Sequence, residues 1–328
     1  MNNYYTKYLK YKNKYLELKN NINQNINQNG GKKIKKTKLT KIRKTKFTKI
    51  INNLLGGGKI EKTIKEIFST FNSETDSLEE NTSELEKIFV KNNISPCHGI
   101  EHAKTVMYNA WEALKDYPEL SKDNILAVLL AALLHDADDG KFFPNHKNNE
   151  NLKLVLQKKG KAFVDKIEYM VNLVSSSKNG NSIPDDVVGK EWMLIPRYAD
   201  RLEAIGLIGI ERCLTYNLQG KRPLYLPTTP RPKTEKEIWA IATKERYERA
   251  IAEKNAGESM IDHYYDKLLY ISTFPISNTF FDEECKIRRR PLIDFLIMFG
   301  KKGSITPEEI KEFIRLRKPN ISHEDEDT

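Results

Sequence analysis

Residues 127–143, AVLLAALLHDADDGKFF, join an apolar run to a dense polar cluster. The run from Ala127 to Leu134 has the length and composition of a buried helix, and His135 and Asp136 follow it directly. Polar groups at the end of a core helix cost free energy unless they are paired or bound. The stretch therefore predicts a helical core that presents reactive side chains at one helix end.

Helical patterns continue along the chain from residue 61 onward. Helices are expected at 98–116, 122–137, 147–158, 161–175, 190–217, 234–255, 258–270 and 282–299, with a short last one after Thr306. Capping boxes are expected at Ser83 with Glu86 and at Thr234 with Glu237. No alternating strand pattern bounded by turn residues is evident. The predicted fold class is all-α, a helical bundle behind a disordered basic N-terminal tail.

Charge divides the chain unevenly. Residues 1–60 contain 16 Lys and Arg against one acid, Glu17, whereas the remaining residues contain 39 basic and 44 acidic side chains. Residues 20–58 are low in complexity and offer too little apolar surface to offset the entropy of ordering. We therefore expect a disordered tail at 1–60, a main domain at 61–300, and a short helix with an acidic tail at 301–328.

Cysteine usage and hydropathy indicate the cellular compartment. The three cysteines include no CxxC pair, so neither a disulfide framework nor a thiolate zinc site is indicated. No apolar run reaches the roughly 18 to 20 residues of a membrane span, and the N-terminus lacks the apolar core of a secretory signal. These features predict a soluble intracellular protein without a transmembrane segment.

Three separated segments contain candidate metal ligands. A divalent metal site favours imidazoles and carboxylates that converge from different helices. His135 and Asp136 are adjacent, so their side chains point about 100° apart and cannot enclose an ion alone. His98 and His102 share one helical face, and Asp200 interrupts an apolar helix, which is costly unless the carboxylate is paired or bound to a cation. An ion pair with the next residue, Arg201, is the alternative for Asp200.

The order of these residues resembles the HD-domain metal-dependent phosphohydrolases. HDADDGKF at 135–142 resembles the HDxxDxKF block of that superfamily's bacterial nucleotide pyrophosphohydrolase-like branch. ADRLEAIGLIGIER at 199–212 is similar to the branch's ADRLDAIGAIGIAR, and HYYDKLL at 263–269 resembles its HFYEKLL. With His102, these blocks fall in the family's order over residues 95–275. Departures from the pattern, which bear on substrate preference, are Gly99, Thr105, Arg197, Tyr198 and Glu203.

The resemblance implies hydrolysis of phosphoanhydride or phosphoester bonds, with a nucleotide as the substrate. It implies one divalent cation, Mn²⁺ or Mg²⁺, held by His102, His135, Asp136 and Asp200. It further implies catalytic roles for Asp139, Lys141 and Arg201 and a phosphate contact for Lys267. His98 either contacts substrate or caps its helix, and Lys178 either contacts phosphate or belongs to a plain surface loop at 174–182.

Two other functions fit part of the sequence. His98, Glu101 and His102 formally match the H-x-x-E-H zinc-protease motif, with Glu168 or Glu191 as third ligand. That interpretation leaves the other blocks unexplained and needs strands. The second alternative is a catalytically inactive HD scaffold whose tail binds nucleic acid or virion components.

The basic tail suggests a polyanionic partner. A disordered segment with a surplus of 15 positive charges binds polyanions through counterion release. Nucleic acid, an anionic membrane surface and a nuclear import receptor are candidates, and AT-rich coding explains the same composition without any binding. YYTKYLKYKNKYLELK at 4–19 resembles N-terminal segments of giant DNA virus proteins, which would place the chain in an infected cell's cytoplasm or in the virion.

Overall fold

The computed structural model describes residues 57–72, 77–94, 98–145, 148–253 and 258–317. Every regular element in these residues is a helix and none is a strand, which confirms the all-α fold class. None of the described helices combines the length and the apolar character that a membrane span requires. The predicted basic tail and acidic C-terminus lie almost entirely outside the described residues.

The chain divides into two compact units. The larger unit is Phe71–Ile314, and the smaller unit includes helix α3 (Gly57–Thr70). The domain boundaries expected near residues 60 and 300 stay predictions. All further description concerns the larger unit.

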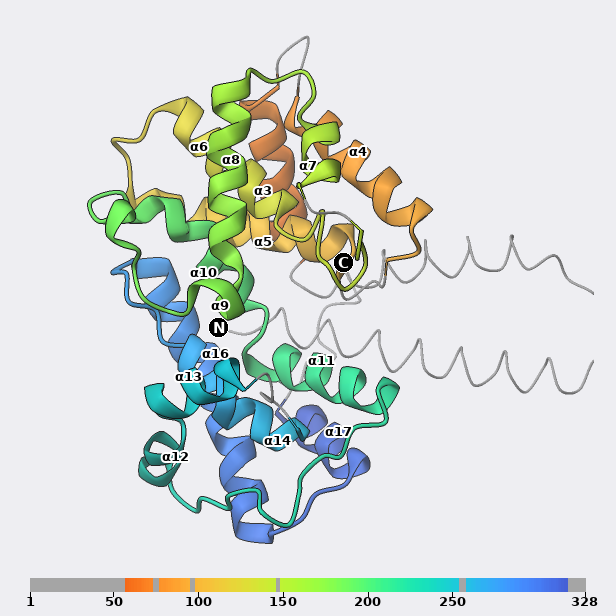
Figure 1. The fold of residues 1–328 in the computed structure, drawn as a ribbon, viewed down its shortest axis with the longest axis vertical. Coiled ribbons are helices and arrows are strands. Elements are labelled where there is room, and N and C mark those ends of the chain that lie inside the picture. Colours follow the sequence, from red (N-terminus) through yellow and green to blue (C-terminus); the bar gives the residue numbers. More distant parts are fainter. Residues whose placement is uncertain (1–56, 73–76, 95–97, 146–147, 254–257, 318–328) are drawn as a thin grey trace, which may run out of the picture. The chain divides into compact units, whose positions relative to one another are not determined.

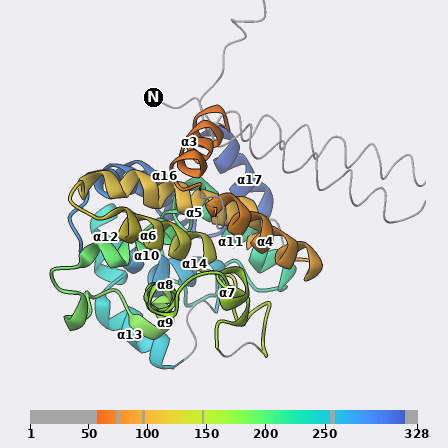
Figure 2. The same ribbon diagram turned by 90° about the horizontal axis from the view of Figure 1, so that it is seen from above.

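Four helices form the first half of the larger unit. They are α5 (Ile100–Ala113), α6 (Lys122–Leu134), α8 (Lys161–Val174) and α10 (Ile195–Leu202), and they pack against one another (Figure 1). Seen from above, α5 and α6 run side by side (Figure 2). Residues Ala127 to Leu134 are fully buried, so α6 is the central core helix that its apolar run predicts. α4 (Leu78–Lys91) and α7 (Glu150–Val155) pack at one side of this group.

The second half of the unit contains a long helix, α16 (Thr279–Lys302). This helix contacts α5 and α10 of the first half, and also α11 (Gly206–Gln219). The remaining helices here are α12 (Glu235–Ile241), α13 (Lys244–Ala252), α14 (Met260–His263), the π-helix η5 (Tyr264–Leu268), α15 (Leu269–Ile271) and α17 (Pro307–Leu316). Short connecting helices are η2 (Leu114–Asp116), α9 (Ser176–Asn179), η3 (Asp185–Val187) and η4 (Glu191–Leu194).

The single helix expected at 190–217 was wrong, because the segment forms η4, α10 and α11. The chain turns at Gly206, whose φ of 79° lies in the left-handed region that favours glycine. A Cβ on Gly209 would lie 2.2 Å from the carbonyl oxygen of Ala204. The apolar pattern runs unbroken through these glycines, so it conceals the turn. As a result, α10 ends at Leu202, and Asp200 lies in its last turn.

Two helix starts show where local signals mislead and where they succeed. The capping box expected at Ser83 was wrong, because α4 begins earlier, with the Ser77 hydroxyl accepting from the Glu80 amide at 3.0 Å. The cap at Thr234 is confirmed, since its hydroxyl accepts from the Glu237 amide at 3.3 Å. The helix expected at 234–255 nevertheless divides into α12 and α13.

Candidate metal centre and adjoining cavity

His135 follows the last residue of the buried helix α6, and its ring orientation is fixed by that helix. Its Nδ1 lies 2.8 Å from the carbonyl oxygen of Ala132, one turn earlier. A carbonyl only accepts hydrogen bonds, so Nδ1 bears a proton, and in the neutral form of the ring, which a bound cation favours, Nε2 presents its lone pair. This is the tautomer that a metal-binding imidazole requires.

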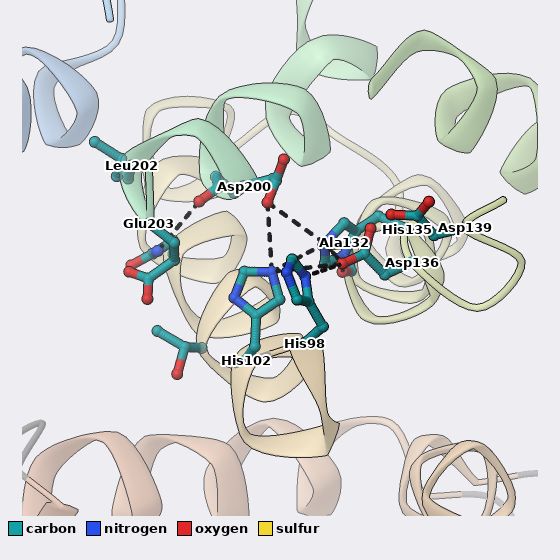
Figure 3. A network of polar contacts seen from close by, with 12 residues as sticks. His98, His102, Ala132, His135, Asp136, Asp139, Asp200, Leu202 and Glu203 are labelled. Atoms are coloured by element: carbon teal, nitrogen blue, oxygen red, sulfur yellow. Dashed lines mark hydrogen bonds and ion pairs between the residues drawn. The ribbon is translucent and has the colours of Figure 1, made fainter. Parts of the chain in front are cut away.

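Four ligand atoms from three helices meet at this point (Figure 3). The Nε2 atoms of His102, from α5, and His135 are 3.2 Å apart. Asp200 Oδ1, from α10, lies 3.4 Å from the first and 3.5 Å from the second. Asp136 Oδ2 lies 3.5 Å from His135 Nε2 and 3.9 Å from His102 Nε2. Ligands about 2.1 Å from one ion at angles of 90 to 109° are about 3.0 to 3.4 Å apart. The spacings of His102 to His135 and to Asp200 lie in this range, and the other three exceed it by 0.1 to 0.5 Å.

The charges of the four groups also suit a dication. Burial and then Arg212 lower the pKa of His102. Burial alone would lower the pKa of His135, but Asp136 outweighs it and holds this pKa well above its usual range. Burial likewise favours protonated carboxyls, yet the imidazoles hold the pKa of both Asp136 and Asp200 below the ordinary range. Two ionised carboxylates beside two imidazoles leave a negative surplus that a divalent cation matches. His102, His135 and Asp136 form a group that can hold a metal ion.

His98 lies at the edge of this cluster rather than at a helix cap. Its Nδ1 is 3.4 Å from Asp136 Oδ2, and its ring lies 5.2 Å from that of Phe142. The N-cap of α5 is Gly99, so the helix-capping interpretation of His98 was wrong.

The aspartates after the HD pair have different partners. Asp138 holds backbone amides of a neighbouring helix. Its two carboxylate oxygens accept the amides of Asn151 and Leu152, each at 2.9 Å, and so hold the start of α7. Asp139 accepts the Lys141 amide at 2.9 Å and pairs with the Lys141 ammonium at 3.4 Å.

Arg201 turns away from its neighbour Asp200. Its guanidinium donates to the carbonyl oxygen of Gly180, at 2.9 Å, and to the side chain of Asn181. The ion pair considered as the whole role of Asp200 is therefore not formed, since the Asp200 carboxylate faces the two imidazoles. Burial lowers the pKa of Arg201 to about 10, which leaves the guanidinium charged near neutral pH.

A second buried arginine holds the same segment, residues 173–182, that contains Gly180 and Asn181. In the sequence it stood out only as a departure from the family pattern. Arg197 is fully buried. Its Nε donates to the carbonyl oxygen of Leu173 at 2.8 Å, and its Nη1 donates to that of Ser182 at 3.0 Å. The α10 helix thus positions a metal ligand on one side and the 173–182 loop on another.

The metal ligands open into a cavity of about 970 Å³. Six basic side chains line it: Lys141, Lys178, Arg201, Arg212, Arg222 and Lys267. Of these, only Lys141 has a carboxylate oxygen within 4.0 Å in the part of the chain that the structure describes. Sequence reasoning missed Arg212, Arg222 and His263 as lining residues. Arg212 and His263 fall inside the resembling blocks, but only the fold shows that they face the cavity.

The glutamates proposed for a zinc protease have other partners. Glu168 accepts from Asn149 at 2.9 Å and pairs with Lys153 at 3.2 Å. Glu191 accepts from the Gly189 amide at 2.9 Å. Glu101, the supposed general base, pairs with Lys104 at 3.4 Å.

Comparison with known proteins identifies a viral relative. The chain is 39% identical over 230 residues to Uncharacterized protein L803 of Acanthamoeba polyphaga mimivirus, a match that spans 64% of this chain and 91% of the relative. The chain belongs to the family of that mimivirus protein. The predicted resemblance to giant-virus proteins is thereby confirmed. No protein-family model matches the chain.

A solved bacterial structure shares the fold. A Lactobacillus plantarum protein matches with a TM-score of 0.53 at 22% identity, over 70% of this chain and 98% of its own. An HD-superfamily hydrolase of Bacillus thuringiensis matches with a TM-score of 0.46 at 21% identity, over 70% of this chain and 97% of its own.

Proposed function

We propose that the protein is a metal-dependent phosphohydrolase that acts on nucleotides. The proposal rests on one arrangement above all: a ligand set for one divalent cation opens into a cavity lined by six basic side chains. A phosphate substrate is anionic, so it supplies the negative charge that five of these cations lack within the described structure. A substrate without anionic groups would leave them unmatched in a concave site.

His102, His135, Asp136 and Asp200 are the proposed ligands of one Mn²⁺ or Mg²⁺ ion. Bound there, the ion would act as a Lewis acid on phosphate oxygens and lower the pKa of a coordinated water. Asp139 and Lys141, whose charges pair at 3.4 Å, stand at the cavity rim, where Asp139 can accept a proton and Lys141 can neutralise phosphate. His98, Lys178 and Lys267 are proposed substrate contacts, since all three line the same cavity.

We propose that Arg201 contributes to catalysis through its buried positive charge. Its guanidinium does not need to donate hydrogen bonds to the phosphate for this role. Two of its donors already hold Gly180 and Asn181, while its Nε is buried without a partner among the described residues. The charge lies on the cavity wall, next in sequence to Asp200. A fixed cation in a water-poor wall stabilises charge that develops on a transferring phosphoryl group.

A nucleotide is favoured over a bare phosphate by the apolar part of the lining. Leu134, Val171, Val174, Leu268 and Ile271 line the cavity together with the cations. A ligand that combines a flat apolar ring with a charged phosphate chain matches both kinds of surface.

The test is phosphate or pyrophosphate release from a nucleotide panel, with and without added Mn²⁺, using the full chain. Variants His135→Gln and Asp200→Asn should lose Mn²⁺ binding by calorimetry and fall at least roughly a hundredfold in kcat, as expected when a metal ligand is removed. Asp123→Asn is the matched control, because Asp123 is an exposed carboxylate in the first turn of the same helix α6. Metal-independent turnover, or turnover that survives Asp200→Asn, would refute the proposal.

A further inference from the structure

A group of basic side chains in the cavity lining is not among the proposed metal ligands. Arg222, His263 and Lys267 line the cavity together with Lys141, yet they come from segments far apart in the chain. Lys267 Nζ has one polar contact within the described structure, the Ser177 hydroxyl at 3.5 Å. The Arg222 guanidinium lies 5.2 Å from the centre of the Tyr216 ring, a stacking contact that orients it without neutralising it.

The backbone brings these groups together by specific bonds. The amide of Met260 donates to the carbonyl oxygen of Pro223 at 3.0 Å, and the amide of Ile261 donates to that of Leu224 at 2.9 Å. These bonds fix the segment that follows Arg222 against the start of α14, the helix that ends at His263. The position of Arg222 beside this helix is therefore built into the fold.

A π-helical turn begins directly after His263 and contains Lys267. Residues Tyr264–Leu268 form this turn, and π-helical turns inside helices are rare and concentrate at functional sites. His263 and Lys267 both reach the cavity, whereas Tyr264 and Tyr265 between them are fully buried. Residues four apart lie on one face of a helical segment, so these two polar groups reach the cavity from a segment that is otherwise buried.

These groups repel one another electrostatically. Burial, followed by Lys267, Arg222 and Lys141, lowers the pKa of His263 to about 4, so the imidazole is neutral near pH 7. Burial, followed by Lys141 and Arg201, lowers the pKa of Lys267. Side chains that raise one another's free energy in this way are stabilised by an anion placed between them.

We propose that the cavity has a second anion subsite, which takes the outer phosphates of a substrate with two or more linked phosphate groups. Its members are Arg222, His263, Lys267 and Lys141. The neutral imidazole supplies a hydrogen-bond donor, and the three cations supply charge. The proposal deepens the phosphohydrolase function and rests on it for the role of the subsite in catalysis. It selects nucleoside diphosphates or triphosphates over phosphate monoesters.

The test is calorimetric titration of inorganic tripolyphosphate into the metal-free full chain, with EDTA and about 150 mM salt, where weak surface charge effects are screened. Arg222→Gln should weaken binding roughly tenfold, the effect of losing one charged hydrogen bond. Lys221→Gln is the matched control, because Lys221 is the exposed neighbouring cation outside the cavity lining. It removes the same charge and should bind like the wild type.

His263→Gln tests the subsite from a second element and should weaken tripolyphosphate binding by a similar factor. Each variant's thermal unfolding is followed by circular dichroism, so that a folding defect is recognised. Equal affinities in all four proteins would overturn the inference, as would equal losses in Arg222→Gln and Lys221→Gln. Because this titration involves neither metal nor turnover, absence of any hydrolase activity would refute the proposed function and leave the anion subsite standing.

Discussion

Removal of Arg288 should destabilise the protein strongly, because it would strand a buried carboxylate beside the metal site. Arg288 Nη1 donates to Glu203 Oε1 at 2.8 Å and to the carbonyl oxygen of Leu202 at 2.9 Å, and its Nε donates to Glu284 at 2.7 Å. Only 7% of the Glu203 side chain is exposed. Breaking such a buried pair by removing one partner costs about 3 to 5 kcal/mol. Arg288→Met keeps most of the side-chain volume and should lose about that much.

The measurement is urea unfolding of the full chain followed by circular dichroism. The double variant Arg288→Met with Glu203→Gln removes the stranded charge as well. It should recover at least about half of the lost free energy, since a buried amide is less costly than a buried unpaired carboxylate. A loss below about 1 kcal/mol in Arg288→Met, or strictly additive losses in the double variant, would refute this account of the pair.

The pH dependence of the same variant gives an independent check. Burial alone would raise the pKa of Glu203, but Arg288 outweighs it and holds this pKa below its ordinary range. A carboxyl with a lowered pKa in the folded state stabilises the protein above its unfolded-state pKa, and this contribution is lost as the pH falls through the folded-state value. In Arg288→Met burial dominates, so the sign reverses. The difference in free energy of unfolding between Arg288→Met and the wild type should therefore become smaller as the pH falls from 7 toward 4.

Three further changes test separate parts of the structure. Asp138→Ala should cost about 1 to 2 kcal/mol, because it removes both acceptors at the start of α7, and hydrogen exchange should accelerate at the Asn151 and Leu152 amides. Gly209→Ala should cost about 2 kcal/mol or more in urea unfolding, because its Cβ would lie 2.2 Å from Ala204 O, whereas Gly140→Ala, with no heavy atom within 4 Å, should change little. Mn²⁺ at a hundred times its Kd should raise the free energy of unfolding by about 2.7 kcal/mol and therefore raise Tm. Asp200→Asn should abolish this rise.

Local signals in the sequence mark the candidates for the metal cluster, whereas the set of four ligands follows from the resemblance to HD-domain phosphohydrolases. His135 and Asp136 follow directly after the apolar helix α6, and Asp200 is a carboxylate in an otherwise largely apolar segment. Three separated segments come together as predicted, since Asp200 Oδ1 lies 3.4 Å from His102 Nε2. That these residues bind a metal stays a proposal.

The parts that could not be predicted depend on contacts distant in the chain. The break before α11 follows from the close approach of Gly209 to the Ala204 carbonyl, which periodicity does not register. The place of Arg222 in the cavity follows from backbone bonds between residues 223–224 and 260–261. Arg222 itself is exposed and follows a helix end, where a basic residue is common. Only the fold shows that it lines the cavity.

The distribution of charge in the cavity argues against a purely structural role. Four carboxylates and six basic side chains line one space, and unconstrained side chains of opposite sign would pair there. Within the described residues a single such pair forms, between Lys141 and Asp139. Asp136 and Asp200 instead face imidazoles, and among the residues that the structure describes, no carboxylate oxygen lies within 4.0 Å of Lys267 or Arg222. Charges held apart in this way cost stability unless ligands of both signs offset them. A cation between the carboxylates of Asp136 and Asp200 and a phosphate chain beside Lys267 and Arg222 would supply both.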